Sequence, residues 1–195
     1  HIGAIPYVMR EINVPIYATK LTIGIIDNKL REHNMLTKVK RKVVKYGQHI
    51  NLGCFRVEFI RTNHSIQDAA ALAIYSPAGI VVHTGDFKVD YTPVFGDAID
   101  LQRFGEIGKR GVLALMCDST NAERPGFTNS ERTVGKTFDN IFAEHSNTRI
   151  IIATFASNVD RVQQIINSAY KFGRKVVVEG RSMVNIITTA TELGY

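Results

Sequence analysis

The chain has 195 residues, of which 45% are hydrophobic and 22% charged, so it can bury a core and is not disordered throughout. Its formal charge of +6 favours an anionic partner, with nucleic acid as the first candidate. No segment approaches the roughly 18 apolar residues of a membrane span, so a membrane partner is not expected.

Cysteine usage favours a reducing compartment. Cys54 and Cys117 are far apart and follow no paired metal-ligand spacing. We therefore expect two reduced, buried thiols in a cytoplasmic protein rather than a disulfide framework.

The first part of the chain predicts short alternating elements. A helix is expected over residues 4–10, a strand over 15–18 and a helix over 21–33, where apolar residues recur at helical spacing. A basic run containing Lys40, Arg41 and Lys42 follows. An exposed edge strand is the simpler interpretation of this run, and a contact with nucleic-acid phosphates is the alternative.

The next segment predicts a strand and a hairpin. Residues 53–64 form an apolar strand that stops at Thr62-Asn63-His64, and strands 70–76 and 79–87 are joined by a Ser-Pro-Ala-Gly turn of type I. Pairing across this turn puts Asp86 opposite Ala69, five residues after His64. The hairpin should therefore bring His64 and Asp86 to the same edge of the sheet.

From residue 112 the pattern changes to alternating strands and helices. Strands are expected over 112–118, 149–155 and 175–180, and helices over 130–145, 157–173 and from 182 onward, with Ser130 and Ser182 as N-caps and Gly173 as a helix stop. Such alternation is typical of a parallel, doubly wound sheet. The change in pattern divides the chain into residues 1–124 and 125–195.

Three side chains are candidates for chemistry. His64 and Asp86 are an imidazole and a carboxylate, the ligand types of Zn²⁺ or Mn²⁺, although a histidine at a strand end is more often a structural polar residue. Asp118 follows an apolar strand and either caps its loop or lies at the rim of the same site. His83 falls on the opposite face of its strand and is read either as a packing residue or as a group that supports the metal ligands from behind. The remaining histidines, His33, His49 and His145, are read as non-functional, and "GEIGKRG" has the wrong order for a phosphate loop.

Several segments, taken in order, resemble the ribonuclease J family. They are "HIGAIPYV", "TNHSIQDAAALAI", "VVHTGDFKVDYTPV", "CDSTNAERPG", "TFASNVDRVQQII" and "EGRSMVN". The resemblance implies an α/β fold: a metallo-β-lactamase-type αββα part over 1–124, followed over 125–195 by the start of a β-CASP domain. Since the first half of the family's leading metal-binding motif and its downstream histidines are absent, these residues read as an internal fragment without a full metal-ligand set.

The resemblance also implies the site and its chemistry. His1, His64 and Asp86 match metal ligands of the family, with Asp86 shared between two divalent ions, and Asp118 matches a catalytic acidic position. The implied activity is that of a metal-dependent ribonuclease, acting on single-stranded RNA from the 5′ end or internally, in a homo-oligomer or paralogue complex. Lys40, Arg41 and Lys42 are candidate RNA contacts.

Two other functions compete with this interpretation. A metallo-β-lactamase-fold hydrolase of small esters or thioesters would share the metal ligands, but it has no need of a second domain or of the basic charge. A non-catalytic paralogue or fragment that binds RNA or partner subunits would keep the fold and lack the metal.

Overall fold

The computed structural model describes residues 2–195, and its first elements form a small layer around one helix. These elements are α1 (Ile5–Glu11), β1 (Ile16–Ala18), α2 (Lys20–Glu32) and β2 (Arg41–Val43). Strands β1 and β2 pair in parallel. The apolar face of α2 buries Ile23, Ile26 and Leu30 against Met35 and Val39. The helical spacing read from the sequence is therefore confirmed.

A five-stranded sheet follows, in the order β3-β4-β5-β6-β7. Its strands are β3 (His49–Leu52), β4 (Phe55–Arg61), β5 (Ala70–Ser76), β6 (Gly79–His83) and β7 (Ala114–Met116). The predicted hairpin is confirmed, because Ser76 pairs with Gly79 and Leu72 with His83. The Ser76 hydroxyl donates to the Gly79 carbonyl at 2.9 Å and closes the turn.

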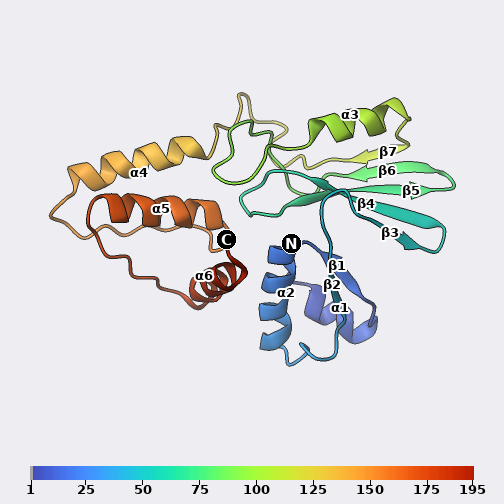
Figure 1. The fold of residues 1–195 in the computed structure, drawn as a ribbon, viewed down its shortest axis with the longest axis horizontal. Helices are drawn as coiled ribbons and strands as arrows, with labels where there is room; N and C mark the ends of the chain where they lie inside the picture. Colours follow the sequence, from blue (N-terminus) through green and yellow to red (C-terminus); the bar gives the residue numbers. More distant parts are fainter. Residues whose placement is uncertain (1) are drawn as a thin grey trace.

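Helix α3 (Leu101–Lys109) packs on one face of this sheet and lies next to β6 and β7 in Figure 1. Its Ile107 packs into a cluster with Ile60, Ala71, Ala73 and Val82. The "GEIGKRG" segment therefore runs through the end of α3, in keeping with the exclusion of a phosphate loop.

The last part contains α4 (Arg132–Glu144), α5 (Val159–Lys171) and α6 (Arg181–Leu193). Phe138 and Phe142 of α4 pack against Ala169 of α5. Gly173, with a φ of +64°, ends α5 as predicted. The predicted N-caps of the other two helices are wrong. The N-cap of α4 is Glu131 in place of Ser130, so the helix starts one residue later. The N-cap of α6 is Gly180 in place of Ser182, so that helix starts two residues earlier.

Two predicted strands, over 149–155 and 175–180, do not form. They lie beside one another along a groove under α5, but no backbone ladder joins them. Ile151 and Val177 are 87% and 80% exposed. These runs have the apolar side chains of a buried strand. A strand also needs a neighbouring strand to pair with, and residues 2–195 provide none for either run. Tyr170 continues the apolar spacing of Val162 and Ile166 along α5, yet its side chain is exposed.

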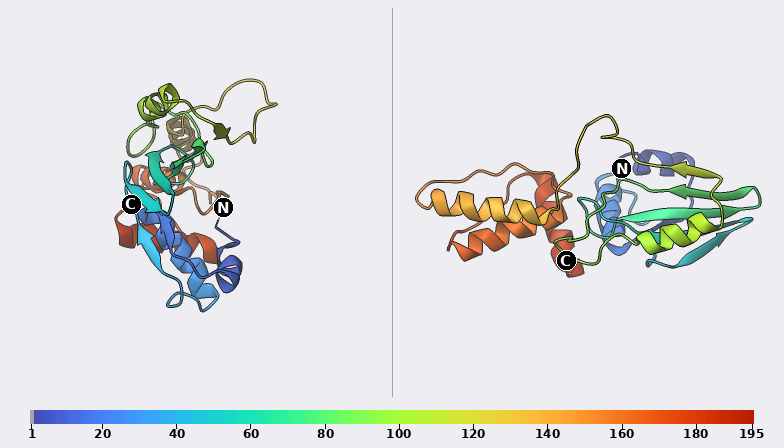
Figure 2. Two further views of the ribbon diagram at one scale, coloured as in Figure 1. Left: turned by 90° about the vertical axis from the view of Figure 1, so that its right-hand side faces the viewer. Right: turned by 90° about the horizontal axis from the view of Figure 1, so that it is seen from above.

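The sheet and the α4–α6 helices lie at opposite ends of the molecule, with α2 between them (Figure 1, Figure 2). Helices α2 and α6 contact each other at Gly24, which faces Thr189 and Leu193. The described residues thus form the mixed α/β fold expected from the sequence. Within them, no helix is both long and apolar enough to span a membrane.

Both cysteines are exposed, so the expectation of buried thiols is wrong. Cys54 lies in the turn between β3 and β4, and Cys117 follows β7 at the edge of the sheet. In both places the chain has left the strands that carry the core, so these thiols lie at the surface.

Candidate metal centre

A cavity of about 740 Å³ lies where the sheet meets the helical part. One wall is the segment that follows β4, and a second is the loop that follows β6. The third is formed by residues around Asp118, by the N-terminus of α5 and by Tyr195. The cavity therefore collects the ends of strands and the start of a helix, where polar side chains emerge from the core.

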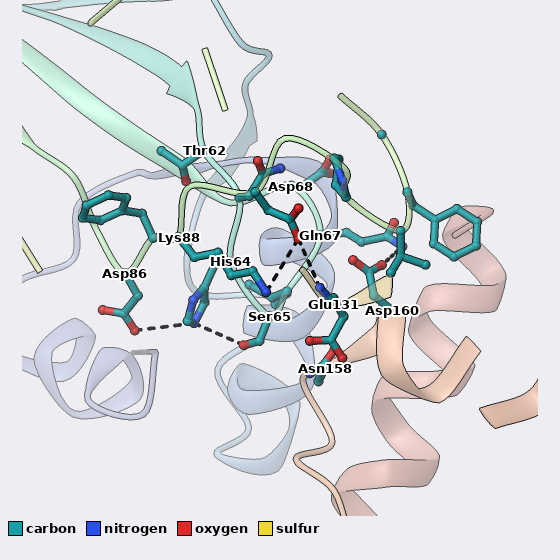
Figure 3. Close-up of a pocket in the computed structure, with 18 of the residues that line it drawn as sticks. Thr62, His64, Ser65, Gln67, Asp68, Asp86, Lys88, Glu131, Asn158 and Asp160 are labelled. Carbon is teal, nitrogen blue, oxygen red and sulfur yellow. Dashed lines mark hydrogen bonds and ion pairs between the residues drawn. The ribbon is translucent and has the colours of Figure 1, made fainter. Parts of the chain in front are cut away.

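His64 and Asp86 face each other in this cavity (Figure 3). The His64 Nε2 lies 3.7 Å from an Asp86 carboxylate oxygen, and both side chains are about one-third exposed. Beyond the hairpin ladder, the Lys88 N–H donates to the Asn63 carbonyl at 2.7 Å and holds the two segments together. The expectation that the sheet brings His64 and Asp86 to one edge is confirmed.

Asp118 lines the same cavity and is held by its own loop. The hydroxyl and the backbone N–H of Thr120 donate to its carboxylate at 2.7 and 3.0 Å. These bonds, led by that from the Thr120 hydroxyl, lower the pKa of Asp118 below its usual value. The loop-capping role is therefore present, and it keeps an ionised carboxylate beside the His64–Asp86 pair.

The other predicted site residues do not join this group. His1 lies outside the described residues. Lys40, Arg41 and Lys42 are on or next to β2 and do not line the cavity. Arg41 binds Asp27 at 2.6 Å and the Val39 carbonyl at 2.6 Å, so its guanidinium has a structural role.

Carboxylates dominate the electrostatics of the cavity. Among residues 2–195, each of the three cations that line it is paired: Arg61 with Asp97 at 2.9 Å, Lys88 with Asp90 at 3.6 Å and Arg161 with Glu131 at 2.7 Å. Beyond these three ion pairs, the lining also contains the carboxylates of Asp68, Asp86, Asp118 and Asp160, so its acidic side chains outnumber its basic ones. Such a cavity attracts cations and repels phosphate unless a cation is added.

Sequence reasoning missed the residues that close the far end of the cavity. Gln67 donates to Asp160, and Tyr195 donates to the Asp68 carboxylate. Asp160 is buried at the start of α5, and burial raises the pKa of its carboxyl group above the usual value. No local sequence pattern predicts these two hydrogen bonds, because each joins segments that are distant in the sequence.

The side chains of this cavity are of the types that bind a divalent metal ion. The imidazole of His64 and the carboxylates of Asp86 and Asp118 are ligands that Zn²⁺ and Mn²⁺ both accept. Among residues 2–195, no group of three or more histidine, cysteine, aspartate or glutamate side chains is arranged to hold an ion.

Comparisons with known proteins agree on one family. The model "Ribonuclease J, beta-CASP domain" matches residues 147–195. Over its whole length the chain is 46% identical to Ribonuclease J of Synechocystis sp. and 45% identical to Ribonuclease J of Helicobacter pylori strain J99, of which it covers 31% and 28%. It is also 40% identical to Ribonuclease J of Thermus thermophilus, of which it covers 35%.

One solved structure shares the fold. A crystal structure of a protein of unknown function from Enterococcus faecalis V583 aligns with a TM-score of 0.67 and 20% identity, over 93% of this chain and 44% of that one. The chain spans about a third of the length of its curated relatives. Over its whole length it is similar to members of the ribonuclease J family.

Proposed function

We propose that the protein containing this chain is a metal-dependent ribonuclease that hydrolyses phosphodiester bonds of single-stranded RNA in cytoplasmic RNA processing and decay. The observation that supports this best is the approach of His64 to Asp86, 3.7 Å apart in a carboxylate-rich cavity. The relatives named Ribonuclease J support the choice of RNA as substrate.

In this proposal His1, His64 and Asp86 would hold the metal. Two divalent ions, Zn²⁺ or Mn²⁺, would supply Lewis acidity and lower the pKa of a water molecule. The Ser65 hydroxyl lies 3.2 Å from His64 Nε2 and restricts the orientation of the ring. The excess of carboxylates favours cation binding here over direct binding of phosphate.

Asp118 would then accept a proton from the attacking water. Because Thr120 binds its carboxylate through two hydrogen bonds, Asp118 remains ionised to lower pH than an ordinary aspartate. A base in this position promotes attack on phosphorus only if it is close to the reacting water, and Asp118 lines the same cavity as His64.

RNA would be held partly outside the cavity. Since the lining cations of the described residues are already paired, phosphate contacts are expected from exposed groups elsewhere, of which Lys40 and Lys42 on the β2 segment are candidates. Association with further copies or with a paralogue stays a prediction for the complete protein.

The test uses the full-length protein with 5′-labelled single-stranded RNA. After dialysis against a chelator, cleavage should be lost and should return with Mn²⁺ or Zn²⁺. Release of mononucleotides would show attack from the 5′ end, and internal fragments would show endonuclease action.

The same preparation separates the two alternatives. RNA binding without cleavage under any metal would favour a non-catalytic paralogue. Hydrolysis of small esters without cleavage of RNA would favour a small-substrate hydrolase. Cleavage that persists unchanged in the chelator would contradict the proposed metal dependence.

A further inference from the structure

The segment of residues 63–69 carries His64 and is fastened to the helical part of the molecule. It leaves β4, crosses the edge of the cavity and enters β5. Two consecutive residues near its end, Gln67 and Asp68, bind groups from α5 and from the C-terminal side of α6. The placement of His64 is therefore linked to elements distant in sequence.

Asp68 makes the larger set of contacts. Its carboxylate accepts hydrogen bonds from the Tyr195 hydroxyl and, at 3.3 Å, from the Leu21 N–H at the start of α2. Its carbonyl accepts from the Thr19 hydroxyl at 2.8 Å. Asp68 also has a φ of +61°, in the left-handed region that few residues other than glycine adopt. Contacts from separate parts of the chain thus hold Asp68 in a backbone conformation that few residues adopt.

Tyr195 is itself held in place. The Lys20 ammonium donates to the Leu193 carbonyl at 2.7 Å and lies 5.8 Å from the centroid of the Tyr195 ring. On the next turns of the same pair of helices, the Asn28 amide donates to the Thr189 hydroxyl at 2.9 Å. The contact between α2 and α6 therefore presents the Tyr195 hydroxyl to Asp68 in a fixed direction.

Gln67 adds an independent link. Its amide donates to the carboxylate of Asp160, which is 9% exposed at the N-terminus of α5. Residues 67 and 68 thus bind two different helical segments of the last part of the chain. A shift of α5 or α6 would act on the segment that holds the His64 ring.

We propose that Asp68 is a positioning residue that couples the docking of α6 to the placement of His64. In this view the Tyr195–Asp68 bond orders residues 63–69, and His64 reaches its place opposite Asp86 only when the helical part is docked. The metal-binding half of this inference rests on the proposed function, whereas the ordering of the segment does not.

The experiment compares Tyr195→Phe with Tyr170→Phe in the full-length protein. Both variants remove one tyrosine hydroxyl, but Tyr170 is 87% exposed on α5 and has no part in the cavity. Hydrogen exchange of residues 63–69 in metal-free protein reports the ordering. Calorimetric titration with Mn²⁺ and the separate values of kcat and KM report its consequence for the site.

Tyr195→Phe should raise exchange in residues 63–69 several-fold, weaken Mn²⁺ binding by about 10-fold and lower kcat with little change in KM. Tyr170→Phe should do none of these. Asp68→Asn, which tolerates the same backbone conformation but removes the charge, should resemble Tyr195→Phe.

The two halves of the inference can fail separately. Unchanged exchange in Tyr195→Phe would overturn the coupling, whatever the metal does. Faster exchange with unchanged Mn²⁺ affinity would leave the coupling in place and contradict His64 as a metal ligand, and with it the proposed function.

Discussion

The His64 imidazole and the Asp86 carboxylate lie 3.7 Å apart because a strand end and a hairpin arm meet at one edge of the sheet. The backbone bond from Lys88 to Asn63 continues that alignment past the last ladder pair. The relationship depends on sheet register, so a one-residue slip in β5 would separate the two side chains.

Asp160 should make the folded state more stable when it is uncharged. Burial raises its pKa above the ordinary 3.8, so its contribution to stability is present below that value and is lost as pH rises through the raised pKa. Asp160→Asn should therefore raise the thermal unfolding midpoint at pH 7, and the gain should vanish near pH 3.

A matched control is Asp139→Asn. Its carboxylate binds Lys171 and Ser168, and the bond from Lys171 lowers its pKa. This variant should lose stability at pH 7 rather than gain it. Equal behaviour of the two variants across the pH range would contradict the assignment of Asp160 as a buried, destabilised carboxylate.

Glu58 anchors α3 to the sheet. Burial by itself would raise the pKa of Glu58, but hydrogen bonds from Arg103 and Tyr75 outweigh it and lower the pKa. Glu58→Gln should cost about 1–3 kcal/mol at pH 7, because it weakens a buried ionic contact. A lowered pKa gives its full stabilisation above the ordinary value and loses it as pH falls through the lowered one, so the difference between variant and parent should shrink as pH falls below about 4.

Glu106→Gln is the control for this prediction. Glu106 binds the same Arg103 at 2.8 Å but is exposed to solvent. Its replacement should change the free energy of unfolding little, since exposed ion pairs are screened. Chemical denaturation at pH 7 compares the two, and equal losses would show that burial of Glu58 is unimportant.

Gly24 sets the distance between α2 and α6. A Cβ atom there would lie 2.7 Å from Thr189 Cγ2 and 2.9 Å from Leu193 Cδ1. Gly24→Val should lower stability by about 1–3 kcal/mol through overpacking. Gly105→Ala, in α3 with no neighbour within 4 Å, should instead stabilise by up to about 1 kcal/mol. Thermal unfolding distinguishes the two signs, and a stabilising Gly24→Val would contradict this packing.

The basic run offers a prediction about RNA binding. If Lys40 and Lys42 bind phosphates, the double substitution to alanine should reduce the slope of log affinity against log salt by up to about 0.7 per lost contact. Arg41→Ala should act mainly on stability, because Arg41 binds Asp27 and the Val39 carbonyl. An unchanged salt slope in the lysine variant would favour the exposed edge strand as the whole explanation.

Local signals predicted most of the first part of the fold. The turn from Ser76 to Gly79 fixes its register through its own residues, and that register was sufficient to bring His64 and Asp86 together. The helices were equally readable, because their apolar residues recur within a few positions. The N-caps of α4 and α6 were harder to predict, because Glu131 and Gly180 make no side-chain capping hydrogen bond.

Non-local contacts account for what the sequence did not reveal. The apolar runs at 149–155 and 175–180 indicate strands, but strand formation depends on a neighbour that those residues do not encode. The Asp68–Tyr195 and Gln67–Asp160 bonds likewise join polar residues without any shared pattern. The left-handed backbone of Asp68 could not be predicted either. Aspartate adopts that conformation more readily than most residues, but the residue type alone does not show where it does so.

The proposed function depends on a catalytic metal held by His64 and Asp86 in the complete protein. The direct measurement is RNA cleavage and bound metal for full-length His64→Ala and Asp86→Ala, beside His145→Ala at the end of α4 as a control. Both site variants should lose bound metal and at least about 100-fold in cleavage rate, while His145→Ala should keep both. Full activity and unchanged metal content in either site variant would contradict the proposed function.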